Sequence, residues 1–375
     1  MRPDKIAGRR HCGWPGVVAA LVACLGLLAL ATLFRPGNVA VEFRETRYVF
    51  GTLVEIVIRD TDAQMAREAA AEVGALLQSL HHDWHAWQQG RLTDLNAAIA
   101  ARRPSRMDPR LATVLTEGQR LACLSGGLFQ PAIGRLVALW GFHADTLPEG
   151  GPPSASAVAA LRRANPRMAD LRLDGDILRS TNPAVQLDLG GFAKGAALDL
   201  ANEALRARGI ENAVLNAGGD VNVLGTHGAR PWRVAVRDPF VWGAIASVAL
   251  RPGEVLYTSG NYERFFEHEG ARFAHIVDPR TGVPVREIVS VSVLDTNGLR
   301  ADAAATALSV AGRSGFAATA AAMGVEAVLM IADDGEVIAT PAMRARLEPA
   351  GESFPDAITI QPLPDVTPPD CEQPR

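Results

Sequence analysis

The sequence has 375 residues, of which 48% are hydrophobic and 21% are charged, and its formal net charge at pH 7 is -4. This composition is typical of a globular protein, and the length allows one large domain or two lobes. Outside the first residues there is no basic stripe, so binding to DNA or RNA is not expected.

The four cysteines (Cys12, Cys24, Cys123 and Cys371) lie far apart in the sequence. Their spacing resembles neither a zinc ribbon nor a CxxC motif, and it indicates no disulfide framework, although it does not exclude an oxidising compartment. Cys123 lies in an apolar helical stretch, which favours a core position.

The N-terminus is typical of a membrane anchor. Residues 1–15 are basic, and residues 16–34 form an uncharged apolar run that is about as long as a membrane-spanning helix needs to be. The charge bias predicts a cytoplasmic N-terminus and places the domain from 35 to 346 in the periplasm, on the inner membrane. The LVAC sequence ending at Cys24 resembles a lipobox, so a lipid anchor is the alternative. The apolar run continues ten residues past Cys24, which favours the uncleaved anchor.

Taken in chain order, the patterns predict both helices and strands. Residues 47–60 alternate like a strand with a Gly-Thr interruption, a helix follows from residue 63, and a second helix covers 109–124. The serine-capped segment from residue 154 predicts a short helix, and residues 171–180 predict a hairpin. Later strands and helices mix without strict alternation, which predicts an α+β fold with mixed, largely antiparallel sheets. The Pro- and acid-rich tail, 347–375, is expected to be loosely ordered.

One strand-to-helix corner is unusually polar. In QLDLGGFAKGAALDLA, from Gln186 to Ala201, Asp188 ends an expected strand, Gly190 and Gly191 permit close backbone approach, and Lys194 lies in the first turn of a helix. Helix N-termini attract anions, so this corner suits phosphate oxygens. The alternative is a plain glycine turn in which Asp188 caps the helix and Lys194 faces solvent.

Two further motifs carry hard oxygen donors or a base. In ADAAATALSV, Asp302 and Thr306 are four residues apart on one helical face and could bind Mg²⁺ together with substrate phosphates; an N-cap role for Asp302 is the alternative. In HIVDPRTG, His275 is expected on a strand face with Phe273 and Val277. There it is either a packed core residue or a general base.

The HHDWHAW segment, His81 to Trp87, contains three histidines, but no further ligand cluster completes a zinc site. We interpret it as a helix end whose tryptophans stack on a planar ligand. The segments LNAGGDVNVLG and YTSGNYERFF add a kinked strand and a turn.

The order of these motifs, from LDLGGFAKGAALD through LNAGGDVNVLG, YTSGNYERFF and HIVDPRTG to ADAAATAL, resembles the ApbE family of FAD:protein FMN transferases. The resemblance covers residues 48 to 340 and implies that family's T-fold-like architecture. It also implies a reaction: FMN is transferred from FAD, with Mg²⁺, to a threonine or serine hydroxyl of a flavoprotein, and AMP is released.

The resemblance also assigns roles by position. Asp302 and Thr306 match side-chain metal ligands, and Gly191 matches a position that ligates through its backbone carbonyl. Asp188, Lys194 and Ile276 match FAD contacts, and His275 matches the histidine that acts on the acceptor hydroxyl.

The flavin contacts depart from the family pattern. Phe50 stands where the family usually has Met, Gln130 stands where it has Asp, and Trp87 corresponds to the aromatic residue that stacks on flavin. Leu128 and Phe129, which precede Gln130, complete the expected contacts. The implied partner is an exported or membrane redox flavoprotein.

Two alternatives stay open. An FAD pyrophosphatase would use the same metal site with water as the acceptor. A non-catalytic, membrane-tethered flavin-binding protein would retain FAD without releasing AMP.

Overall fold

The computed structural model describes residues 42–350 and 354–371. The expected anchor at 16–34 and the lipobox residue Cys24 lie outside these ranges. Within them, none of the helices has both the length and the apolar character that crossing a membrane requires.

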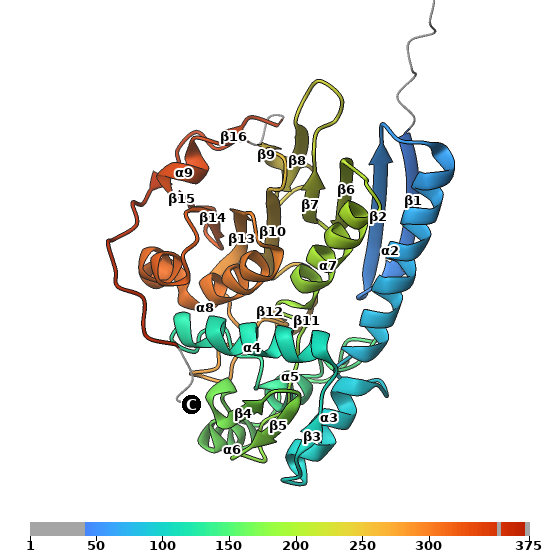
Figure 1. The fold of residues 1–375 in the computed structure, drawn as a ribbon. Coiled ribbons are helices and arrows are strands. Elements are labelled where there is room, and N and C mark those ends of the chain that lie inside the picture. The colour runs from blue at the N-terminus through green and yellow to red at the C-terminus, as the bar shows by residue number, and fades with distance from the viewer. Residues whose placement is uncertain (1–41, 351–353, 372–375) are drawn as a thin grey trace, which may run out of the picture. The chain divides into compact units, whose positions relative to one another are not determined.

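A nine-stranded sheet forms the centre of the described domain (Figure 1). In sheet order its strands are β1 (Glu42–Val49), β2 (Thr52–Arg59), β6 (Asn212–Ala217), β7 (Asp220–Leu224), β10 (Val255–Gly260), β13 (Ile288–Asp295), β14 (Ala327–Ala332), β15 (Val337–Ala339) and β17 (Thr359–Ile360). Only the β15–β17 pair is parallel among these described strands.

Three smaller sheets surround the main sheet. They are β3 (Ser105–Arg106) with β5 (Ile177–Ser180) and β4 (Leu171–Asp174); β16 (Leu347–Glu348) with β9 (Ala244–Leu250) and β8 (Trp232–Arg237); and β11 (Phe265–His268) with β12 (Ala271–Ala274). The predicted α+β class with largely antiparallel sheets is confirmed.

Helices cover one face of the main sheet, and Figure 1 shows α2, α7 and α8 lying across it. The helices are α2 (Ala63–Asp83), α3 (Arg91–Ala100), α4 (Pro109–Leu124), α5 (Gly134–Leu139), α6 (Ala155–Ala164), α7 (Ala193–Ala207), α8 (Gly298–Met323) and α9 (Pro341–Arg344), with a 3-10 turn at Met168–Asp170.

Strand alternation divides the core between the two faces of the sheet. In β14, Val328 and Met330 belong to the cluster that includes the helices, whereas Leu329 and Ile331 pack with β8 and β9 on the other face. Successive residues of a strand point to opposite faces, so the continuous apolar run of β14 is explained by burial on both sides.

Local capping sets the predicted helix boundaries. Asp108 accepts the backbone N–H groups of Arg110 and Leu111, and Pro109 occupies the first turn of α4. Ser154 caps α6 in the same way. Helix α8 is interrupted at Gly312, which adopts a positive φ of 66°.

The first predicted strand is in fact a hairpin. β1 and β2 turn back on each other at Phe50 and Gly51, whose φ angles are 53° and 72°. Two successive residues with positive φ match the right-handed twist of the paired strands, which explains a tight turn where the sequence indicated only an interruption.

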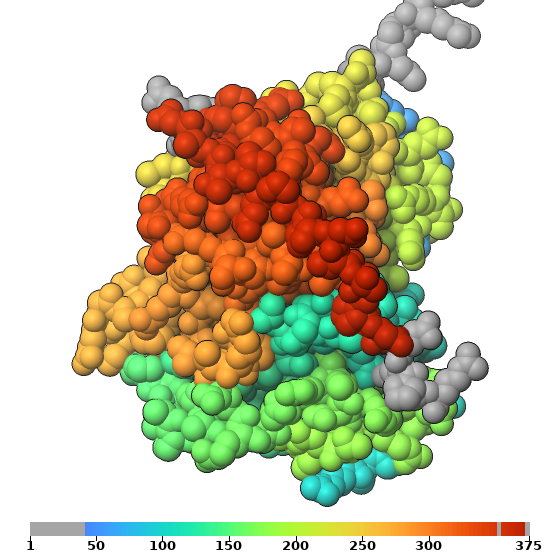
Figure 2. All heavy atoms as spheres, turned by 90° about the vertical axis from the view of Figure 1, so that its left-hand side faces the viewer, coloured from blue at the N-terminus to red at the C-terminus, as the bar shows by residue number. Residues whose placement is uncertain are grey.

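The C-terminal segment corrects two expectations. Instead of being loosely ordered, it pairs through β17 with β15 and ends in a disulfide between Cys371 and Cys123 of α4. Figure 2 shows this segment in red, running across the surface to α4. Cys123 is therefore a disulfide partner and not a plain core cysteine. The two cysteines are 248 residues apart, and only the tertiary fold brings them together.

Candidate active site

The predicted site residues gather at one end of the main sheet, which we call the site end. The β1–β2 turn, the Gly218–Gly219 turn between β6 and β7, and the last residues of β10 all lie there, because β2 pairs with β6, β6 with β7, and β7 with β10. The backbone N–H of Thr258 donates to Asp220 at 2.9 Å and ties β10 to the start of β7. Glu42, at the start of β1, lies at the opposite end.

The glycine corner leads into α7, but no strand precedes it. Leu187 and Leu189 are almost fully buried, and only Gln186 forms an isolated bridge, to Ile133. Asp188 does not cap the helix. Its Oδ1 accepts the N–H of Gly190 at 2.7 Å, and its Oδ2 accepts a hydrogen bond from His143 Nε2 at 2.7 Å. The N-cap of α7 is Phe192, whose side chain makes no capping hydrogen bond, and the backbone N–H groups of Phe192 and Ala193 donate to the carbonyl of Leu189.

Asp188 is held ionised. Burial alone would raise the pKa of its carboxyl, but the hydrogen bond and charge of His143 and the N–H of Gly190 outweigh burial and lower it. The corner thus contains a fixed negative charge close to the positive end of the α7 dipole.

Lys194 lies between two buried carboxylates. Its Nζ forms an ion pair with Asp220, whose side chain is 3% exposed, while the lysine side chain keeps 29% exposure. Burial alone would lower the pKa of Lys194, but Asp220 and Asp302 raise it, so the lysine stays charged. The alternative in which Lys194 faces solvent is therefore wrong. Its partly exposed ammonium is available to an anionic ligand.

Asp302 is a buried acid in the second turn of α8. Asn297, not Asp302, is the N-cap of α8. The Oδ2 of Asp302 accepts the N–H of Gly195 at 2.9 Å, so this carboxylate joins α8 to the start of α7. Burial and the neighbouring Asp220 raise the pKa of Asp302 to about 7, against the opposing attraction of Lys194.

Three oxygen donors from distant segments lie together. The Thr306 hydroxyl donates to the carbonyl oxygen of Gly191 at 3.3 Å, and Asp302 precedes Thr306 by one helical turn. A Cβ added at Gly191 would lie 3.3 Å from Thr306 Oγ1, so glycine permits this close approach. The Oγ of Ser259 is 3.5 Å from the same hydroxyl.

This donor set fits a hard divalent cation. A carboxylate, a hydroxyl and a carbonyl are the ligands that Mg²⁺ accepts while it keeps positions for water and substrate oxygens. In the part of the chain that the structure describes, no group of three or more His, Cys, Asp or Glu residues is arranged to hold a metal. The HHDWHAW histidines accordingly form no such group.

His275 directly follows β12, whereas it was expected inside a strand. Its Nδ1 donates to the carbonyl of Arg264 at 3.3 Å, which leaves the lone pair on Nε2. Burial, together with the charges of Arg264 and Lys194, lowers the pKa of His275 to about 4. The ring is therefore neutral at physiological pH and can accept a proton. Phe273 and Val277 pack in one apolar cluster, as predicted, and Ile276 is also buried.

A series of aromatic rings joins the β1–β2 turn to Asp188. Phe50 lies 5.5 Å from His81, and His85 lies 4.3 Å from Trp87. Trp87 stacks on His143 at 5.2 Å with an interplanar angle of 23°. His143 in turn donates to Asp188, so Trp87 and the corner carboxylate are coupled through one imidazole. Trp87 and Phe50 are partly exposed and present ring surface at the site end.

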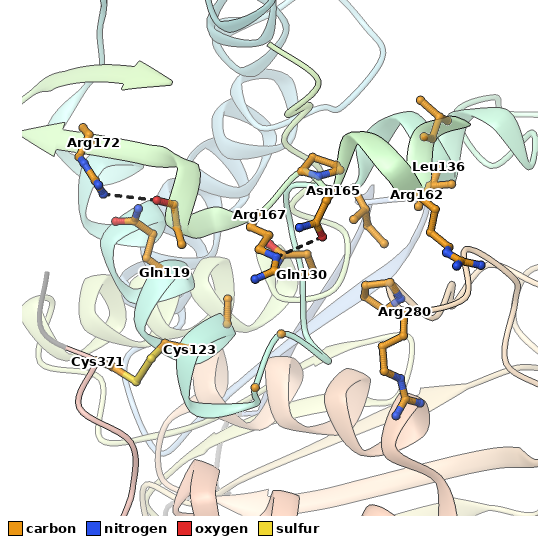
Figure 3. Close-up of a pocket in the computed structure, with 18 of the residues that line it drawn as sticks. Gln119, Cys123, Gln130, Leu136, Arg162, Asn165, Arg167, Arg172, Arg280 and Cys371 are labelled. Atoms are coloured by element: carbon orange, nitrogen blue, oxygen red, sulfur yellow. Dashed lines mark hydrogen bonds between the residues drawn. A yellow bond between two sulfur atoms is a disulfide. The ribbon is translucent and has the colours of Figure 1, made fainter. Parts of the chain in front are cut away.

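Leu128 and Phe129 pack in the core, whereas Gln130 lines a separate cavity. Phe129 is buried and packs against Phe192, 5.1 Å between ring centres, beneath the glycine corner. Leu128 packs against the same core. Gln130 accepts the N–H of Met168 at 2.8 Å and lines a cavity of about 440 Å³ beside the Cys123–Cys371 disulfide (Figure 3). None of Asp188, Lys194, His275, Asp302 or Thr306 lines this cavity.

Sequence reasoning missed three groups at the site. His143 orients Asp188, Asp220 holds Lys194, and the Arg264 carbonyl sets the tautomer of His275. The acid directly after the double glycine of LNAGGD was a signal for Asp220. No local sequence pattern points to His143 or Arg264, because the tertiary fold brings them to Asp188 and His275.

Known proteins resemble this chain along most of its length. Residues 50–329 match the ApbE family. The FAD:protein FMN transferase of Rhodobacter capsulatus is 55% identical over 355 residues, which cover 93% of this chain and 68% of the relative. The FAD:protein FMN transferase of Vibrio cholerae is 31% identical over 321 residues, which cover 84% of this chain and 94% of the relative.

Solved structures show the same fold. The ApbE protein of Thermotoga maritima superimposes with a TM-score of 0.76 at 27% identity, over 82% of this chain and 100% of that one. The flavin transferase ApbE of Vibrio cholerae gives a TM-score of 0.71 at 28% identity, with the same two coverages. The protein is thus an enzyme, and its relatives define its class as a transferase. The chain belongs to the ApbE family.

Proposed function

We propose that this enzyme transfers FMN from FAD to a threonine or serine hydroxyl of a protein and releases AMP, with Mg²⁺ as the cofactor. One observation carries the proposal: Gly191, Asp302 and Thr306 converge beside Lys194 at the start of α7. The names of the relatives supply the substrate class.

Charge neutralisation is the main task of this arrangement. Cleaving the FAD diphosphate requires that negative charge on both phosphates be stabilised, and a bound Mg²⁺ supplies this as a Lewis acid. Asp302, Thr306 and the Gly191 carbonyl would hold the cation. The Lys194 ammonium, kept charged by Asp220, would bind phosphate oxygens, and the positive end of the α7 dipole would add to this attraction.

The acceptor hydroxyl needs a base. His275 is neutral, with its lone pair on Nε2, and would accept the hydroxyl proton. The hydroxyl oxygen then forms a bond to the FMN phosphorus as the bond from that phosphorus to the AMP oxygen breaks. A base with a pKa of about 4 is weak, so general-base help belongs to the lower part of the usual range of about 10²–10⁴-fold. Electrostatics and positioning must supply most of the remaining acceleration.

We assign binding of the isoalloxazine ring of FAD to the aromatic residues that lie between the β1–β2 turn and Asp188. Trp87 and Phe50 present ring surface next to the corner, where an isoalloxazine can stack. The family resemblance assigns Asp188, Ile276, Leu128 and Phe129 to the same ligand, and Gln130 is the least direct of the proposed contacts because its amide oxygen is engaged by Met168.

We also propose that the enzyme is tethered to the cytoplasmic membrane, with its catalytic domain in the periplasm. The basic N-terminus and the apolar run at 16–34 support this, because their charge bias favours export of the following domain. The Cys123–Cys371 disulfide adds independent support, since such bonds persist in oxidising compartments. The acceptor would then be an exported or membrane redox flavoprotein.

The experiment combines the purified full chain with FAD, Mg²⁺ and candidate periplasmic redox proteins. The expected result is acid-stable flavin fluorescence on the acceptor band, with AMP released. Free FMN and AMP with an unlabelled acceptor would instead establish an FAD pyrophosphatase. FAD retained in a one-to-one complex without AMP would establish a non-catalytic binding protein.

A further inference from the structure

The tip of the β8–β9 hairpin exposes three consecutive large apolar residues. Phe240, Val241 and Trp242 are 53%, 56% and 97% exposed, and we call them the 240–242 tip. Most large apolar side chains of the described domain are buried, so three consecutive exposed ones, two of them aromatic, indicate an interaction surface.

Hydrogen bonds order this tip. The buried carboxylate of Asp238 accepts the N–H of Phe240 at 2.9 Å and of Val241 at 3.2 Å. The backbone N–H of Asp238 donates to the carbonyl of Gly243 at 3.0 Å and closes the loop. A loop already fixed in one conformation loses little entropy when a partner binds, so the tip is preorganised for docking.

The base of the tip adjoins the catalytic donors. Arg237, the last residue of β8, lies 4.8 Å over the ring of Tyr262 and pairs with Glu263 at 3.7 Å. Tyr262 and Glu263 lie two and three residues after the end of β10. In β10, the Oγ of Ser259 is 3.5 Å from the Thr306 hydroxyl. The base of the 240–242 tip therefore lies near the site end of the main sheet, close to the catalytic donors.

We infer that the 240–242 tip docks the acceptor protein and brings its target hydroxyl to His275. This inference rests on the proposed function, in which a whole protein must approach the site. Exposed Trp and Phe side chains typically anchor such interfaces by entering an apolar pocket of the partner, and Trp242 is the natural anchor. The partner surface is accordingly an apolar pocket near the target threonine or serine.

A bilayer is the less suitable occupant. The base of the tip contacts Tyr262 and Glu263, next to the catalytic donors, and the reaction proposed at those donors needs a protein hydroxyl there rather than lipid.

The test measures flavin transfer by the full-length chain in detergent micelles, where no bilayer is present. Its probes are the acceptor protein identified by acid-stable labelling, and a short peptide copied from the sequence around the labelled hydroxyl. The variants are Trp242→Ser and Phe240→Ser/Trp242→Ser. Met65→Ser is the matched control, because Met65 is 43% exposed and lies in the first turn of α2, at the Glu42 end.

The double variant should raise KM for the acceptor protein at least about tenfold, as expected on removing an interface anchor. Its kcat, its affinity for FAD and its kcat/KM for the peptide should match those of the wild type and of Met65→Ser. An unchanged KM for the protein, or equal losses with protein and peptide, would overturn the docking role. A defect seen only in vesicles would assign the tip to lipid. If the wild type labels no protein, the proposed function itself fails, and the docking surface fails with it.

Discussion

Replacing Asp302 with asparagine should abolish catalysis and yet stabilise the metal-free enzyme. Asparagine retains the shape of the side chain and an oxygen for the Gly195 N–H, but it removes the buried charge. The loss of one charge about 4 Å from a cation is worth roughly 4 kcal/mol at an effective dielectric constant near 20, or about 10³-fold in rate. Transfer should fall by at least that order.

The stability effect has the opposite sign. Because burial and Asp220 raise the pKa of Asp302 from 3.8 to about 7, the folded state binds this proton more tightly than the unfolded state does. The carboxyl therefore destabilises the fold progressively as the pH rises from about 4 to 7, by at most about 4 kcal/mol. Asp302→Asn should then unfold at a higher temperature than the wild type at pH 8 in EDTA.

The assay compares thermal unfolding of both proteins at pH 8 and at pH 5, together with transfer activity. At pH 5 the wild-type carboxyl is protonated, so the difference in Tm should shrink. Substantial transfer by Asp302→Asn, or a variant that is less stable than the wild type by the same amount at both pH values, would refute this reasoning.

Three further predictions concern neighbouring features. His275→Asn should slow transfer by about 10²-fold or more while the FAD dissociation constant, measured by flavin fluorescence, stays within a factor of two or so; unchanged transfer would mean that the histidine is merely packed. Lys194→Met should weaken FAD binding and lower the free energy of unfolding by about 3–5 kcal/mol, because Asp220 is left buried without its cation. Denaturant unfolding measures this loss. The companion variant Lys194→Met/Asp220→Asn should recover much of that stability. Cys371→Ser should lower the free energy of unfolding by about 2–5 kcal/mol, since the disulfide closes a loop of 248 residues; an unfolding curve identical to that of the wild type would show that the bond does not form.

Local chemistry made the element boundaries predictable. The helix at 109–124 begins at an Asp-Pro cap, and the hairpin at 171–180 turns at Asp174-Gly175, because these signals act within a few residues. The corner before α7 shows the limit of pattern reading. Leu187 and Leu189 alternate with polar residues as a strand does, but the alternation reflects burial of a loop that pairs with residues 131–134 only around the isolated Gln186–Ile133 bridge.

The oxygen donors were predictable because a family-like order of motifs pointed to them, although their proximity was not visible in the sequence. The partners that tune them were missed. His143 reaches Asp188 across 45 residues, and Asp220 reaches Lys194 across 26. The disulfide joins cysteines whose neighbours carry no signal, since the path of the C-terminal segment across the surface is decided by β17 and by packing of Leu363 on the core.

The proposed metal site makes one direct prediction: a divalent cation held by Asp302 and Thr306 contacts the diphosphate of FAD beside the glycine corner. It is tested most directly by titrating FAD into the wild type and into Thr306→Ala and Asp302→Asn, each with and without Mg²⁺, and repeating the titration with FMN, which lacks the diphosphate. In the wild type only, Mg²⁺ should tighten FAD binding by at least about tenfold, with little effect on FMN. An equal effect of Mg²⁺ on all three proteins, or on both flavins, would contradict it.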